Sequence, residues 1–254
     1  MTCASSAFPR PWTTTSSRRT TVPGIRASRA GSPPPSATAL ARTHEDAAPH
    51  LIYLPERPIR REQVLADVEA VYRRLGRVVI AVCEGQKDEH GRYLAASTKA
   101  VDVDRFGHPQ LGGVAAVLCE LISSGLKLKA RFDKPGTIQR VSAALASPVD
   151  VEEAAGVGRD AVAYAVEGRS GLMVTIVREA NEPYRSRTAL VPLERVANRV
   201  RPVPDDFIAP SGSDVTGAYL DYARPLLGGE LPRYARLRNT PVPRAPASPI
   251  RGGA

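Results

Sequence analysis

The stretch LIYLPERPIRREQVLADVEAVYRRLGRVVIAVCEG, residues 51–85, decides the fold that the sequence predicts. Its first four residues are apolar and are followed by Pro55, which predicts a short strand. Apolar residues then recur at helical spacing over residues 61–75, and Gly76 provides a helix end. The six apolar residues 78–83 predict a second strand, buried on both faces of a parallel sheet. A strand–helix–strand unit of this kind is typical of a layered α/β domain.

The chain beyond this unit continues the alternation of helices and strands. Helical spacing predicts helices over residues 110–124, 150–167 and 214–226. Short segments with alternating or consecutive apolar residues predict strands over residues 126–132, 172–177 and 189–193. Acidic residues at the start of the middle helix suit the positive end of its dipole. We therefore expect a Rossmann-like α/β domain with a mainly parallel sheet, in which ligands bind beyond the carboxyl ends of the strands.

The net charge of +9 is concentrated at the two ends of the chain. Residues 1–36 contain five arginines and no acidic residue, and so do residues 231–254. Removing these ten charges leaves a net charge of −1 for residues 37–230. The composition of residues 1–36, rich in Ser, Thr, Arg and Pro, and that of the Pro-rich tail 239–254 predict disordered ends. The folded part is expected between residues 37 and 238.

The sequence argues against several classes of protein. It has no run of 18 apolar residues, so no membrane span is expected. The three cysteines are far apart and the four histidines offer no ligand pair at helical spacing. This pattern argues against a disulfide or a histidine metal site and favours a cytoplasmic protein. Nucleic-acid binding through the arginine-rich ends is a weak hypothesis, since few aromatic residues there could stack on bases.

Three places that follow predicted strands carry residues able to bind a ligand. Glu56 lies between two prolines after the first strand, where it could accept hydrogen bonds from sugar hydroxyls or be a solvated turn residue. Glu84 follows the second strand, and we assign it no role. Residues 127–140 carry five cations around a Pro-Gly turn, a pattern that suits a phosphate as well as an ordinary solvated loop.

These segments resemble the second half of the phosphofructokinase family, and its pyrophosphate-dependent branch more than its ATP-dependent one. The resemblance rests on the strings LPERP, FGHPQLGG, RFDKPGTIQRVSAALASPVD and VTGAYLDYARPL, which occur in the family's order between residues 37 and 237. It implies the second lobe of a two-lobed enzyme that transfers phosphate from pyrophosphate to fructose 6-phosphate in glycolysis, with Mg²⁺ as cofactor. It also implies a homo-oligomer with shared active sites. ATP as the phosphate donor remains an alternative.

The resemblance assigns substrate-binding residues one by one. The set comprises Glu56, Arg131, Thr137, Ile138, Gln139 and Arg140. Glu56 matches the carboxylate that accepts hydrogen bonds from the hydroxyls of fructose 6-phosphate. In the substrate loop, Arg140 holds the 6-phosphate, and Thr137 replaces the His or Tyr that is common at its position. Arg131 matches the arginine that reaches the 6-phosphate in the neighbouring subunit.

Other parts of the family's active site have no counterpart in the sequence. Neither a Gly-rich phosphate loop nor a string like PKTVDND with the catalytic Asp occurs, so no catalytic residue and no Mg²⁺ ligand is assigned. GC-rich codons for the family's VGVPKTVDNDL, shifted by one base, encode SAFPRPWTTT, which stands here at residues 6–15. We therefore expect residues 1–36 to be an out-of-frame leader and the chain alone to be inactive. A non-catalytic sugar-phosphate-binding remnant is the second hypothesis.

Overall fold

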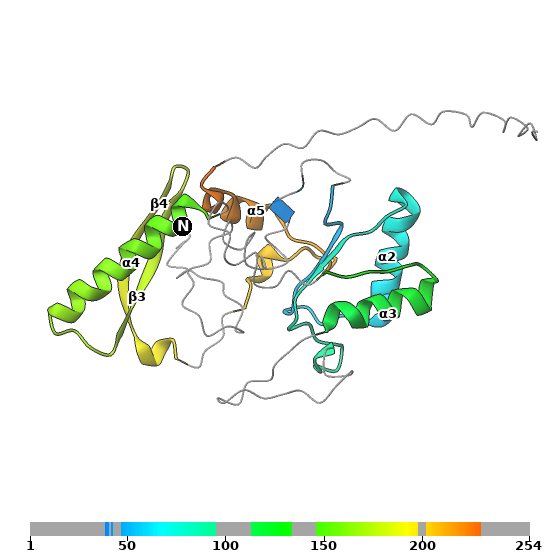
Figure 1. The fold of residues 1–254 in the computed structure, drawn as a ribbon, viewed down its shortest axis with the longest axis horizontal. Coiled ribbons are helices and arrows are strands. Elements are labelled where there is room, and N and C mark those ends of the chain that lie inside the picture. The colour runs from blue at the N-terminus through cyan, green and yellow to red at the C-terminus, as the bar shows by residue number, and fades with distance from the viewer. Residues whose placement is uncertain are drawn as a thin grey trace, which may run out of the picture.

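The computed structural model describes residues 39–40, 42, 47–94, 113–133, 146–197 and 202–229, drawn in colour in Figure 1. The two ends that the composition predicts to be disordered therefore lie outside the described residues. Among the helices of the described ranges, none has the length and apolar character needed to cross a membrane.

The stretch that decides the fold forms the predicted strand–helix–strand unit. Its elements are β1 (Leu51–Tyr53), α2 (Arg61–Leu75) and β2 (Ile80–Val82). The two strands pair in parallel, with Ile52 opposite Ala81. The helix ends where Gly76 adopts a φ of 67° and its N–H donates to the Tyr72 carbonyl at 2.7 Å. Glycine adopts this left-handed conformation without steric cost, which is why the sequence marks the helix end correctly.

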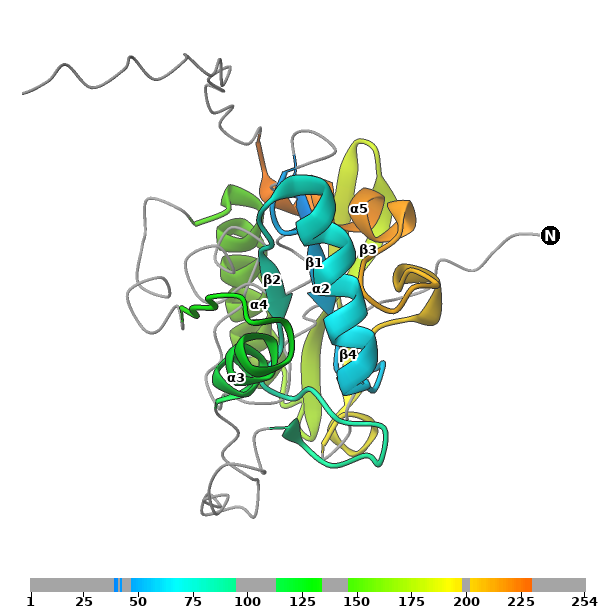
Figure 2. The same cartoon turned by 90° about the vertical axis from the view of Figure 1, so that its right-hand side faces the viewer.

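One face of β1 is covered by two helices. These are α2 and α3 (Val114–Leu126), which lie on the same side of the strands in Figure 1 and flank them in Figure 2. They form a first core cluster of Leu51, Tyr53, Ile59, Val64, Val68, Leu94, Val114, Leu118 and Ile122. The Tyr53 hydroxyl also donates to Asp67 Oδ2 at 2.9 Å, which ties the strand to the helix above it. Burial and the neighbouring carboxylate raise the pKa of Tyr53 far above its usual value, so the phenol remains a donor.

The opposite face of β1 is covered by the C-terminal described segment. The second core cluster contains Ala39, Ile52, Leu54, Phe207, Ile208, Val215, Tyr219, Ala223, Leu226 and Leu227. The Ile52 N–H donates to the Ser213 carbonyl at 2.8 Å, so this segment also contacts the backbone of β1. With Ile52 and Tyr53 at most 1% exposed, β1 is fixed from both faces and sets the position of the residues that follow it.

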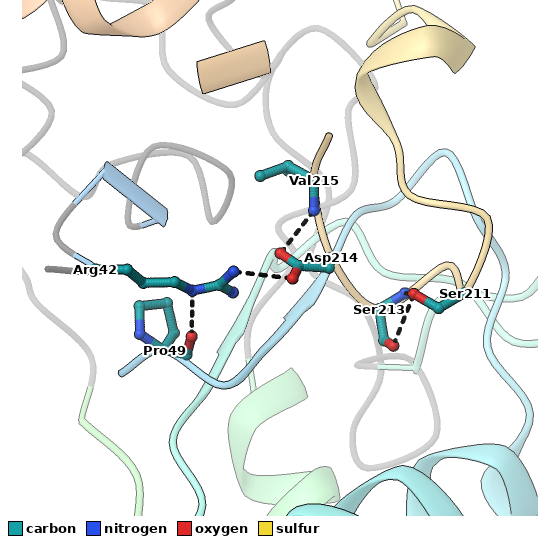
Figure 3. Close-up of polar contacts among 6 residues, drawn as sticks. All are labelled: Arg42, Pro49, Ser211, Ser213, Asp214 and Val215. Atoms are coloured by element: carbon teal, nitrogen blue, oxygen red, sulfur yellow. Dashed lines mark hydrogen bonds and ion pairs between the residues drawn. The ribbon is translucent and has the colours of Figure 1, made fainter. Parts of the chain in front are cut away.

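The last predicted helix is divided in the structure. It begins late, as α5 (Gly217–Ala223), and continues as the 3-10 helix η7 (Arg224–Leu227). Pro225 cannot donate the next helical hydrogen bond, because its nitrogen carries no hydrogen. Asp214, predicted as the first helical residue, instead accepts from Arg42 Nη1 at 2.8 Å and from the Val215 N–H at 2.7 Å (Figure 3). Arg42 Nε donates to the Pro49 carbonyl at 2.6 Å and thereby links this segment to the chain before β1.

Two predicted strands differ from what the structure contains. β2 covers half of the predicted 78–83 and is half-buried rather than enclosed on both faces, and Val79 beside it is 46% exposed. Within the described residues the parallel sheet has two strands, which leaves one edge of β2 without a neighbouring strand. Residues 126–132 form no strand, because α3 extends into them and Leu128 and Ala130 then pack on the first core cluster. The alternating apolar residues of this segment therefore face the core from a loop and not from a strand.

The remaining elements are a helix and the hairpin that packs along it (Figure 1). They are α4 (Pro148–Val166), β3 (Leu172–Asn181) and β4 (Tyr184–Pro192). Both predicted strands exist here, but they are longer than expected and pair antiparallel. A two-residue connection joins antiparallel neighbours, whereas a parallel pair needs a long crossover. The α/β class is confirmed, with parallel pairing in the β1–α2–β2 unit and an added antiparallel hairpin.

Candidate functional site

Glu56 lies in the turn that follows the carboxyl end of β1. The turn is closed by the Arg57 N–H, which donates to the Leu54 carbonyl at 3.0 Å. One carboxylate oxygen of Glu56, Oε1, accepts a hydrogen bond from the Val203 N–H at 3.0 Å. The other oxygen, Oε2, is buried and has no hydrogen-bond partner among the described residues. A buried carboxylate oxygen of this kind can accept a hydrogen bond from a ligand.

A pocket of about 390 Å³ opens beside this carboxylate. It is lined by Glu56, Arg57, Pro202, Val203, Pro204 and Asp205. An ion pair joins its two walls, since Arg57 Nη2 lies 2.9 Å from Asp205 Oδ1. The volume is within the range of small-molecule sites, and a single positioned carboxylate with flanking charges suits a small polar ligand.

The end of β2 lies beside the end of β1, as a parallel sheet requires. A Cβ added to Gly85 would lie 3.8 Å from Pro55 Cβ and 3.9 Å from Cys83 Sγ. Burial raises the pKa of the Cys83 thiol above its usual value, and the negative charges of Glu56 and Glu84 contribute to the increase. The two strand ends therefore form one negatively charged edge, at the place where α/β sheets bind their ligands.

Gln86 is a buried residue beside the Glu56 turn that the sequence did not single out. It is fully buried, and its Nε2 donates to the carbonyls of Arg57 at 2.7 Å and Lys87 at 3.3 Å. These bonds tie the loop after β2 to the turn that carries Glu56. The only signal in the sequence is a polar residue within a polar loop, and nothing in that pattern predicts that it is buried.

The other predicted site residues are not assembled around Glu56 in the described structure. Arg131 is described and exposed, and it is not among the residues that line the pocket. Residues 137–140, with the predicted phosphate-binding Arg140, lie outside the described residues. Of the predicted site residues that the structure describes, Glu56 lines the pocket and Arg131 does not.

A metal site is not formed by the described side chains. Within the described ranges, no group of three or more His, Cys, Asp or Glu residues could hold a metal ion. The Glu56 carboxylate keeps an oxygen that can accept a hydrogen bond and so orient a ligand.

The parallel β-α-β unit with a carboxylate pocket at its strand ends places the chain in the α/β class, and comparisons with known proteins identify the family. No family profile matches the chain. Over 213 residues it is 41% identical to the pyrophosphate–fructose 6-phosphate 1-phosphotransferase of Rhodospirillum rubrum, covering 82% of this chain and 52% of that protein. The enzyme of the same name from Xanthomonas campestris is 36% identical over 216 residues, covering 82% and 51%.

Solved structures give the same result. The pyrophosphate-dependent phosphofructokinase of Marinobacter aquaeolei superposes with a TM-score of 0.63 at 32% identity, covering 83% of this chain and 50% of that one. The enzyme from Nitrosospira multiformis gives 0.64 at 30% identity, covering 86% and 52%. The chain belongs to the phosphofructokinase family, and the four relatives named here are pyrophosphate-dependent enzymes. It spans about half the length of the relatives that it matches.

Proposed function

We propose that the chain forms the fructose 6-phosphate-binding portion of a pyrophosphate-dependent phosphofructokinase. The reaction transfers a phosphoryl group from pyrophosphate to the 1-hydroxyl of fructose 6-phosphate and gives fructose 1,6-bisphosphate and orthophosphate. The observation that carries the proposal is the Glu56 pocket at the end of β1, in a chain whose relatives bear that enzyme name. The setting is glycolysis in the cytoplasm.

In this proposal Glu56 binds and orients the sugar. Its Oε1 is engaged by the Val203 N–H, so Oε2 is the oxygen that accepts from the sugar hydroxyls. Hydrogen bonds to a charged group are worth about 1.5–3 kcal/mol each in proteins. Glu56 lies on a turn fixed by a fully buried strand, which limits the loss of conformational freedom when the sugar binds.

The 6-phosphate of the sugar is assigned to the substrate loop, residues 137–140. Arg140 would grip the 6-phosphate through its guanidinium fork, with Thr137, Ile138 and Gln139 as the remaining contacts of the substrate loop. Arg131 is exposed, as an arginine that reaches into a neighbouring subunit's site must be. The proposal therefore includes a homo-oligomer with shared active sites.

Phosphoryl transfer itself is assigned to parts of the enzyme that have no counterpart in this sequence. In such a reaction a bound metal ion would supply positive charge against the developing negative charge, and a catalytic Asp would accept the hydroxyl proton. The residues that we assign here bind and orient fructose 6-phosphate. We therefore propose that the chain alone binds the sugar phosphate and does not turn it over.

The proposal is tested by titrating the purified chain with fructose 6-phosphate in a calorimeter. Arg140→Ala should abolish measurable binding, and Arg159→Ala, which removes an exposed arginine of α4, should not change it. A parallel assay with Mg²⁺ and pyrophosphate should detect no fructose 1,6-bisphosphate. The absence of binding by the unaltered chain would overturn the proposed substrate, and turnover by the chain alone would overturn the division of roles.

A further inference from the structure

We propose that the outer face of α4, the side turned away from the hairpin, is a docking surface for the half of a phosphofructokinase that has no counterpart in this chain. The outer face consists of exposed residues at helical spacing, Val151, Ala155, Gly158, Val162 and Ala165. In Figure 1, α4 lies at the opposite end of the described structure from α2 and α3. Docking there is independent of the sugar site, since none of the five residues lines the Glu56 pocket.

The helix packs on the hairpin with its polar side. Glu153 Oε1 accepts hydrogen bonds from the hydroxyls of Tyr184 at 2.5 Å and Ser186 at 2.7 Å. Two turns further along the helix, Asp160 accepts a hydrogen bond from the Thr188 hydroxyl. A helix at a protein surface normally turns its apolar stripe to the core and its polar side to water. In α4 this arrangement is reversed, so the apolar stripe faces outward.

The valines of α4 are largely uncovered. Val151 is 59% exposed and Val162 is 66% exposed, and Val166, which lies next to the outer face at the end of the helix, is 83% exposed. Of the 19 residues of α4, Asp150 alone is buried. Fully burying a valine side chain stabilises a protein by about 1.5–3 kcal/mol, so a partner that covers these residues gains a substantial driving force. Contiguous exposed apolar residues of this kind mark interaction surfaces.

The composition of the outer face suits a broad apolar surface better than a second α4. Three of its five positions are Ala155, Gly158 and Ala165, whose side chains offer little area to a paired helix. Stable interfaces bury roughly 800 Å² on each partner, and two such helices laid against each other would bury little beyond their valines. Small side chains instead allow close approach of a flat apolar surface, such as the face of a sheet in a layered α/β protein.

The relatives of the chain contain residues that could form this surface. The matched region covers 52% of the Rhodospirillum rubrum relative, so nearly half of that protein has no counterpart here. The hairpin beside α4 is also narrow for a sheet. Within the described residues β3 and β4 pair only with each other, which leaves one edge of each strand open to a further strand. The unmatched half is therefore the occupant of the outer face, and it meets α4 through an apolar surface.

Co-expression of the full chain with the unmatched half of the Rhodospirillum rubrum enzyme, carrying an affinity tag, tests the docking surface. We expect the chain to co-purify with that half in a one-to-one complex, whose mass and dissociation on dilution are measured by light scattering. Val162→Lys should weaken the complex about tenfold or more, because it buries an unpaired charge. Ala163→Lys is the matched control, since it adds the same charge at the next exposed position, about 100° around the helix, and should leave the complex unchanged.

Melting curves show which variants fold, and Ala155→Lys, on the same face, serves if Val162→Lys does not. No co-purification of the unaltered chain, or equal effects of the substitutions at residues 162 and 163, overturns the docking surface. A dimer of the chain alone that Val162→Lys dissociates and the Rhodospirillum rubrum half does not displace also overturns it, because the occupant is then a second copy. If the complex forms but does not bind fructose 6-phosphate, the proposed function fails and the docking surface stands.

Discussion

The fully buried Gln86 gives the sharpest test of how the pocket is built. Replacing it with leucine puts an apolar side chain of similar size in the same space. The replacement removes the two hydrogen bonds that Gln86 Nε2 donates. The Lys87 carbonyl also accepts from the Ile59 N–H at 3.0 Å, so it keeps a partner. The Arg57 carbonyl loses its bond of 2.7 Å from Gln86 Nε2. The substitution therefore deprives one carbonyl, in the turn that carries Glu56.

The loss in the free energy of unfolding can be worked out from the Arg57 carbonyl that loses its partner. An acceptor deprived of its partner costs about 1–3 kcal/mol when buried. The substitution also removes Gln86 Oε1, a buried atom with no partner among the described residues, and this recovers part of the cost. We expect Gln86→Leu to lower the free energy of unfolding by about 1–2 kcal/mol and to weaken fructose 6-phosphate binding.

Urea denaturation followed by circular dichroism measures the effect. Gln63→Leu is the matched control, because Gln63 makes its hydrogen bond to Asp67 at the exposed surface of α2. The control should stay within about 0.5 kcal/mol of the unaltered chain. A Gln86→Leu variant as stable as that control would refute the argument that this amide holds the turn.

Three further predictions concern stability and the thiol beside the site. Gly228→Ala should destabilise more than Gly76→Ala in urea titrations. Both residues have positive φ, at 63° and 67°, and only at Gly228 would a Cβ meet the Pro148 ring at 2.7 Å; equal losses would contradict the packing there. Ser147→Ala should cost about 2 kcal/mol in the same assay, because the buried hydroxyl caps α4 and donates to the Leu226 carbonyl at 2.9 Å, and a loss below about 0.5 kcal/mol would contradict both roles. Glu56→Gln should lower the pKa of Cys83 and accelerate its labelling by iodoacetamide at pH 8, while Cys119, whose pKa is raised by burial alone, should react unchanged; an unchanged rate at Cys83 would mean that the two side chains are not close.

The sequence predicts the β1–α2–β2 unit well because local signals agree there. The apolar stripe that contains Val64 and Val68 is buried as its spacing indicates, and Gly76 ends the helix. The strands of the hairpin are harder to predict because the side chains that face α4 are partly polar. On β4, the hydroxyls of Tyr184 and Ser186 donate to Glu153 of α4 at 2.5 and 2.7 Å, so part of the inner face is polar. Alternation of apolar residues therefore identifies these strands only in part.

In the candidate site, too, residues marked by their local sequence can be predicted, whereas contacts between distant segments cannot. Glu56 can be predicted because it directly follows a strand, at the edge where α/β sheets bind ligands. Val203 and Asp205 could not be linked to it, since a backbone N–H carries no residue signature and the two segments meet only in the folded chain. Gln86 escaped prediction because its burial depends on the contact between two loops.

The central claim is that Glu56 binds fructose 6-phosphate at the end of β1. Calorimetric titration of the full chain with fructose 6-phosphate tests it most directly when Glu56→Gln is compared with Glu152→Gln, the same change at an exposed position of α4. The claim predicts saturable binding that Glu56→Gln weakens about tenfold or more and that Glu152→Gln leaves unchanged. Equal affinities of the two variants, or no binding by the unaltered chain, would contradict it.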